Sequence, residues 1–129
     1  MDFRSLATLA AIAALIFGFG LLVSPAQTAA IYGAGSSDVW HLLTARYFGS
    51  GLLMYGAALW ALRALTDPEA QRRAAGLLAA ATAIGLLVTL YAVIGRVMNA
   101  AGWSSVALYG FFVVAWARLA LGRPLSEAA

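Results

Sequence analysis

Two arginines lie inside long apolar stretches of this chain, and their positions indicate a site. Arg46 falls within the apolar run 39–65, and Arg96 falls near the end of the run 74–97. A charged side chain in hydrocarbon costs about 2.5–3.5 kcal/mol, so an ionisable residue in such a run is a functional candidate. A helical Arg46 leans outward to the nearby interface, whereas Arg96 leans back toward the interior.

Other polar and aromatic residues occur near the same ends of these runs. If the runs are antiparallel helices, the residues converge with both arginines at one end. Two cations without an obvious buried carboxylate suit a lipid phosphate, a carboxylate or a quinone carbonyl. The alternative is that the arginines only bond helix-terminal carbonyls and phosphates and so stabilise the helices. The candidate ligand-binding residues are Arg46, Arg96, His41, Tyr91, Asn99 and Trp103.

The chain offers little for catalysis. It has no cysteine and one histidine, which excludes thiolate metal sites, iron–sulfur clusters and bis-histidine haem within one chain. No phosphate-binding loop, nucleophile elbow or metal-ligand cluster is present. We predict no catalytic residue, no metal and no resident cofactor, with a bound lipid or quinone left open. A non-enzymatic role is therefore favoured over an enzyme.

The composition indicates a membrane as the surroundings. Of 129 residues, 64% are hydrophobic and 10% are charged, whereas soluble domains carry about 25% charged residues. All the basic residues are arginine, and the net charge is +3. No basic stripe with interleaved aromatic residues is present, so nucleic acid is not a predicted partner. The predicted partners are membrane lipids and, as alternatives, a larger membrane complex or further copies of the chain.

Four apolar stretches approach the length of about 20 residues that a membrane-spanning helix needs. We predict one domain, 1–129, with an all-α fold in which four transmembrane helices run up-down-up-down. Period-two alternation is lacking, which argues against strands. The four helices are predicted at about 6–23, 39–65, 74–97 and 103–121.

Turn and cap residues separate these stretches. Ser24 and Pro25 end the first helix, because a residue before proline disfavours the helical conformation. A loop then leads to Ser37 or Asp38, either of which suits an N-cap. Asp67 or Thr66 suits the cap of the next helix, and Pro68 suits its first position. Residues 99–102 form a tight turn, and Gly122 suits a C-terminal cap.

The arginines set the predicted orientation. Six of the eight arginines fall on one side of the membrane, whereas Arg46 and Arg96 lie inside the helix ends nearest the other, and the positive-inside rule places the first side in the cytoplasm with both termini. An alternative is that Arg4 and the first run form a secretory signal, but the run is about 18 residues, longer than the usual 7–15. The arginines on the predicted cytoplasmic side are Arg4, Arg63, Arg72, Arg73, Arg118 and Arg123.

Small residues recur on one face of each predicted helix. Helices in lipid associate by close packing of such residues and by interhelical hydrogen bonds, because the lipid is itself apolar. The faces are Ala7, Ala10, Ala11, Ala14 and Gly18 in the first helix, Gly49, Ser50, Leu53, Gly56 and Ala57 in the second, Thr82, Gly85, Thr89, Ala92, Arg96 and Asn99 in the third, and Ser104, Ser105, Ala107 and Gly110 in the fourth.

Two short motifs carry a family resemblance. Ala-Arg-Tyr-Phe-Gly at 45–49, with the glycine-rich run after it, and Asn-Ala-Ala-Gly-Trp at 99–103 resemble small four-helix bacterial inner-membrane proteins described as DoxX-like. The resemblance implies a multi-pass inner-membrane protein and, for some relatives, association with respiratory or other membrane complexes. We predict a non-enzymatic accessory or stabilising component of a complex, or a lipid-binding protein. The alternatives are anion or quinone binding or transport near the outer face, and an oligomeric channel.

Overall fold

The computed structural model describes residues 1–35 and 38–122, which form α-helices and no strand. The predicted all-α fold is thus confirmed over this part of the chain. The predicted roles of Ser37, Arg123 and the C-terminal tail fall outside it. The helices are α1 (Phe3–Val23), α2 (Pro25–Ile31), α3 (Val39–Leu62), α4 (Pro68–Ile94) and α5 (Gly102–Ala120).

Aspartate caps begin three of the long helices. Asp38 accepts a hydrogen bond from the His41 N–H at 2.9 Å, and Asp67 accepts one from the Ala70 N–H at 2.8 Å. Both N-caps were expected from the sequence. Asp2 caps α1 in the same way, with the Ser5 N–H at 2.7 Å, so α1 begins three residues before the predicted start. Each cap satisfies one of the unpaired N–H groups of a first helical turn.

The boundaries of α3 and α4 differ from those expected from hydropathy. α4 begins at Pro68, because proline fits the first helical position and Asp67 caps it. Its charged first turns therefore belong to the helix, ahead of the apolar stretch. α3 ends at Leu62 and the chain then turns toward Asp67.

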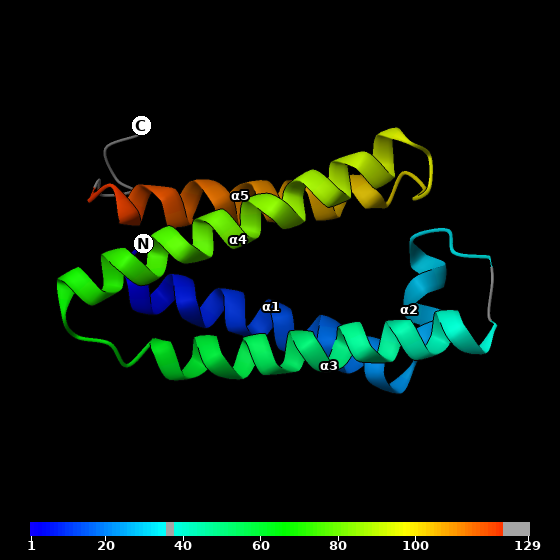
Figure 1. Cartoon of the computed structure of the whole chain (residues 1–129), viewed down its shortest axis with the longest axis horizontal. Helices are drawn as coiled ribbons and strands as arrows, with labels where there is room; N and C mark the ends of the chain where they lie inside the picture. The colour runs from blue at the N-terminus through cyan, green and yellow to red at the C-terminus, as the bar shows by residue number, and fades with distance from the viewer. Residues whose placement is uncertain (36–37, 123–129) are drawn as a thin grey trace.

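The short helix α2 lies where the sequence analysis expected only a turn and a loop. Ser24 breaks α1 as predicted, with φ −131° and ψ 59°, but Pro25 then starts a new helix of seven residues. Its alanines are strong helix formers, and Gly33 with φ +88° reverses the chain after it. α2 leaves the α1 direction and extends toward the turn between α4 and α5 (Figure 1).

The long helices form two antiparallel pairs. α1 packs along α3, and α4 packs along α5, with fewer contacts between the pairs, mainly from α1 to α5 (Figure 1). The chain therefore runs up-down-up-down through the four long helices. We call the end near the N-terminus, with the α3–α4 loop, the N-terminal end. We call the end near α2, with the α4–α5 turn, the α2 end.

Glycines bring the paired helices into backbone contact. A Cβ added at Gly18 would lie 2.9 Å from the Gly49 carbonyl oxygen, and one added at Gly49 would lie 2.8 Å from the Gly18 oxygen. In the other pair, the ring of Tyr109 fills the space beside Gly85, where an added Cβ would meet it at 2.6 Å. The small-residue faces expected on these helices are thus used within the pairs.

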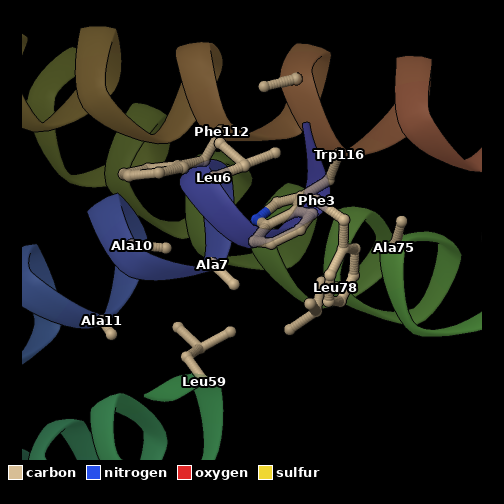
Figure 2. Packing of buried hydrophobic residues seen from close by; sticks show 11 residues of the cluster. Phe3, Leu6, Ala7, Ala10, Ala11, Leu59, Ala75, Leu78, Phe112 and Trp116 are labelled. Carbon is tan, nitrogen blue, oxygen red and sulfur yellow. The ribbon is translucent and has the colours of Figure 1, made fainter. Parts of the chain in front are cut away.

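The two pairs join through an apolar core at the N-terminal end. Phe3 and Trp116 lie at its centre, with ring centroids 5.7 Å apart and planes tilted by 60° (Figure 2). Trp116 and Leu59 are fully buried. The core consists of Phe3, Leu6, Ala7, Ala10, Ala11, Leu59, Ala75, Leu78, Phe112, Ala115 and Trp116.

Three of the helices are long and apolar enough to cross a membrane. They are α1, α4 and α5. α3 has 24 residues, but His41, Arg46 and Ser50 lower its hydropathy, and it is not among the three. Most large apolar side chains of the described residues also face outward, among them Ile16, Tyr91 and Val97. The helices are thus consistent with a membrane protein, and the crossing of α3 remains a prediction.

Candidate functional site

Asn99 joins the α4–α5 turn to the end of α2. Its backbone N–H donates to the Tyr32 carbonyl at 3.0 Å, and its Nδ2 donates to the Ile31 carbonyl at 3.0 Å. These carbonyls belong to the last turn of α2, where no intrahelical donor reaches them. The Asn99 Oδ1 also accepts the Ala101 N–H at 2.9 Å. Asn99, predicted as a ligand residue, therefore caps α2 from a distant part of the chain.

A second bond supports the same junction. The Ser105 hydroxyl on α5 lies 3.3 Å from the Tyr32 hydroxyl. Gly33 follows Tyr32 and lies against Asn99, since an added Cβ would meet the Asn99 Cβ at 3.1 Å. The α2 end is therefore held by hydrogen bonds, whereas the N-terminal end is held by the apolar core.

An open pocket of about 440 Å³ lies beside this junction. Three of the six predicted site residues line it: Arg96, Asn99 and Trp103. A guanidinium group and an indole in one lining suit an anion with an apolar or planar part, whereas the Asn99 amide is already engaged in the hydrogen bonds above. The complete lining is Gly33, Val93, Arg96, Val97, Met98, Asn99, Ala100 and Trp103.

Arg96 has an uncommon backbone conformation. Its φ is +58°, and it is the one described residue other than glycine with a positive φ. The Val97 N–H bonds to the Ala92 carbonyl at 2.9 Å, and the Arg96 N–H bonds to the Val93 carbonyl at 3.1 Å. This is a Schellman motif, in which glycine usually occupies the left-handed position. An arginine in this left-handed conformation costs about 1–2 kcal/mol. The glycine of this segment, Gly95, stands one position too early to occupy the left-handed position.

Replacing Arg96 by glycine is expected to stabilise the fold. Arg96→Gly removes the strain, although part of the gain is offset by the greater freedom of glycine in the unfolded chain. We expect the free energy of unfolding to rise by about 0.5–1 kcal/mol, measured by denaturant titration in detergent micelles. Val97→Gly is the control, since Val97 is 71% exposed and has no positive φ to relieve. If Arg96→Gly and Val97→Gly lowered the free energy of unfolding by equal amounts, the backbone at Arg96 would not be strained.

The other three predicted site residues do not line this pocket. His41 lies in the first turn of α3, where its Nδ1 and the Asp38 Oδ2 are 2.5 Å apart. Arg46 is exposed farther along α3. Tyr91 is 78% exposed on α4. The structure thus brings together half of the predicted cluster, and a joint role for Arg46, His41 and Tyr91 remains a prediction.

A row of polar side chains along α4 was only partly anticipated. Thr82 is buried and donates to the Leu78 carbonyl at 2.6 Å, with the Tyr55 side chain of α3 facing it. Tyr109 of α5 lies over Gly85, one helical turn along α4. The sequence analysis found the α4 side of this row from its spacing. It missed both tyrosines, because periodicity within one helix does not reveal the partners on others.

Comparisons with protein-family models, curated proteins and solved structures find no match. Within residues 1–35 and 38–122, no three His, Asp or Glu side chains gather closely enough to hold a metal ion.

Proposed function

We propose that the protein crosses a bacterial inner membrane four times, with both termini in the cytoplasm. The proposal adds α3 to the three apolar helices because α3 packs along α1 and so shares its surroundings. Its 24 residues span about 36 Å, enough for a bilayer core of about 30 Å. The positive-inside rule supports the orientation. The described arginines at the N-terminal end are Arg4, Arg63, Arg72, Arg73 and Arg118.

Single-cysteine labelling tests this topology, and the chain has no native cysteine to interfere. Ala34 and Ala100 lie at the α2 end, and Thr66 lies in the loop at the N-terminal end; all three are exposed. We expect Ala34→Cys and Ala100→Cys to react with a membrane-impermeant maleimide in intact spheroplasts. Thr66→Cys should react only after the membrane is permeabilised. Reaction of Ala34→Cys and Thr66→Cys from the same side would show that α3 does not cross.

Within the membrane we propose a non-enzymatic role, as an accessory or stabilising component of a membrane complex or as a lipid-binding protein. The observation that carries this proposal is the surface of the molecule. Among the described residues, exposed large apolar side chains outnumber the buried ones, and the core is confined to one end. A surface of this kind is suited to contact with lipid tails or with the helices of another membrane protein. The DoxX-like resemblance favours contact with the helices of another membrane protein.

Co-purification tests this role. We expect the protein, extracted in a lipid-preserving polymer, to carry a partner protein or a phospholipid at a fixed ratio, measured by native mass spectrometry. Extraction in a harsh detergent is the control, because it should strip the bound component. A protein that runs alone, without retained lipid, under the mildest extraction would contradict both forms of the proposal.

The pocket at the α2 end supports a second candidate, the binding of an anion or a quinone near the outer face. Its motivating observation is Arg96, whose strained backbone at the pocket is better explained by a role of its side chain than by folding. The Arg96→Gly variant distinguishes a binding role of the Arg96 side chain from a role in folding, since it should raise the stability of the fold while weakening the binding of an anionic ligand. Unchanged binding of a quinone or an anion in that variant would remove this candidate.

A further inference from the structure

A second pocket lies at the N-terminal end, outside the candidate site described above. It is an open hollow of about 490 Å³ formed by three parts of the chain: the start of α1, the α3–α4 loop and the second turn of α4. Because these parts meet only in the folded molecule, the sequence analysis did not anticipate the pocket. Its lining residues are Asp2, Phe3, Arg4, Arg63, Ala64, Leu65, Thr66 and Gln71.

The walls of this pocket are held in place by specific contacts. The Gln71 Nε2 donates to the Leu65 carbonyl at 2.7 Å, which fixes the loop against α4. The Arg63 guanidinium carbon lies 3.5 Å from the centroid of the Trp60 ring, a cation–π contact that limits its motion. Phe3 is almost fully buried and stacks toward Trp116 in the core. The pocket is therefore largely formed before any ligand arrives.

The pocket carries charges of both signs above an apolar floor. Arg4 and Arg63 contribute two guanidinium groups, and Asp2 contributes one carboxylate. The pKa of Asp2 is lowered mainly by the hydrogen bond from the Ser5 N–H, so this carboxylate is ionised at neutral pH. Phe3 and Leu65 provide the floor. Guanidinium groups that line one pocket suit a phosphate, and a carboxylate in the same lining suits an ammonium group.

The position of the pocket matches the depth of lipid headgroups. It lies where the apolar helix α1 begins and where α3 gives way to the charged α3–α4 loop, and the nearby Trp60 is 42% exposed, as expected of a tryptophan at the interface. We propose that this pocket binds the headgroup of a zwitterionic aminophospholipid, with the phosphate on Arg4 and Arg63 and the ammonium group on Asp2. This inference rests on the proposed membrane insertion and names the lipid class that the cytoplasmic side selects.

Native mass spectrometry of the full chain, with three phospholipids offered at equal concentration, tests the proposal. We expect phosphatidylethanolamine to be retained about tenfold over phosphatidylcholine, whose quaternary ammonium donates no N–H bond, and in preference to phosphatidylglycerol, which has no amine. Equal retention of the three lipids, or a preference for phosphatidylglycerol, would overturn it. Displacement by soluble phosphoethanolamine at equal concentration would also overturn it, because the ligand would then be a free metabolite.

Two variants and a control isolate the charges. Asp2→Asn keeps the N-cap, since asparagine caps as well as aspartate, but should lower the preference for phosphatidylethanolamine over phosphatidylglycerol about tenfold. Arg63→Ala should weaken the binding of both phosphatidylethanolamine and phosphatidylglycerol. Arg73→Ala is the control, because Arg73 pairs with Glu69 outside the pocket. An Asp2→Asn variant that loses both lipids equally would contradict the ammonium site.

This test fails separately from the topology test. If no lipid preference is found but the cysteines react as expected, the proposed headgroup site is wrong and the proposed four-span insertion is still supported. Labelling of Ala34→Cys and Thr66→Cys from one side would remove the insertion, and the headgroup site with it.

Discussion

Trp116→Ala is expected to lower the free energy of unfolding by about 3 kcal/mol. Trp116 is fully buried between the two helix pairs, where it contacts Phe3 at the centre of the core (Figure 2). Truncation leaves a large cavity in the apolar core that joins the pairs. We expect a value at the low end of the range for buried aromatics, because lipid already shields apolar surface from water and mainly packing is lost.

The measurement is unfolding in mixed micelles, followed by circular dichroism against an increasing fraction of denaturing detergent. Trp60→Ala is the matched control, since Trp60 lies on the outside of α3 and should cost less than about 1 kcal/mol. Trp116→Phe should cost much less than Trp116→Ala, because the indole Nε1 has no hydrogen-bond partner among the described residues. Equal losses at positions 60 and 116 would show that the pairs are not joined through this core.

Local features of the fold could be predicted from the sequence because their causes are local. An aspartate before the first helical residue caps a helix by accepting a hydrogen bond from a backbone N–H of the first turn, as Asp38 and Asp67 do. Gly122 likewise ends α5 in the left-handed conformation that glycine favours. The helix α2 was missed because seven residues between a proline and a glycine also fit a loop, and its last carbonyls are satisfied by Asn99 from afar.

The candidate site was less predictable because it depends on helix rotation and on the pairing of helices. One residue changes direction by about 100° around a helix, so an uncertainty of one position moves a side chain to another face. Arg96 and Asn99 lie in the α4–α5 turn and Trp103 lies in the first turn of α5, so the three are close in sequence, and they do line one pocket. His41 and Arg46 depend on the placement of α3, which packs on α1 and not along α4. The pocket at the N-terminal end depends on three separate segments and has no local signal.

The backbone contact between α1 and α3 gives the second large expected effect. Gly18→Val places a branched side chain where even a Cβ would lie 2.9 Å from the Gly49 carbonyl oxygen and 3.0 Å from the Leu53 nitrogen. Both neighbours are backbone atoms and cannot rotate away, so the helices must separate along their length. Overpacking of this kind costs about 1–3 kcal/mol, and we expect the upper end because van der Waals contact is the main force between helices in lipid.

Gly51 provides a matched control on the same pair of helices. It lies on α3 two residues from Gly49, but an added Cβ there meets nothing within 4 Å. Gly51→Ala should therefore stabilise the helix by about 0.5–1 kcal/mol, because alanine loses less backbone freedom than glycine. Both variants are compared with the original chain in the same micelle unfolding assay. If Gly18→Val were tolerated as well as Gly51→Ala, the small-residue face of α1 would not hold α3, and the argument that α3 shares the membrane environment of α1 would lose its support.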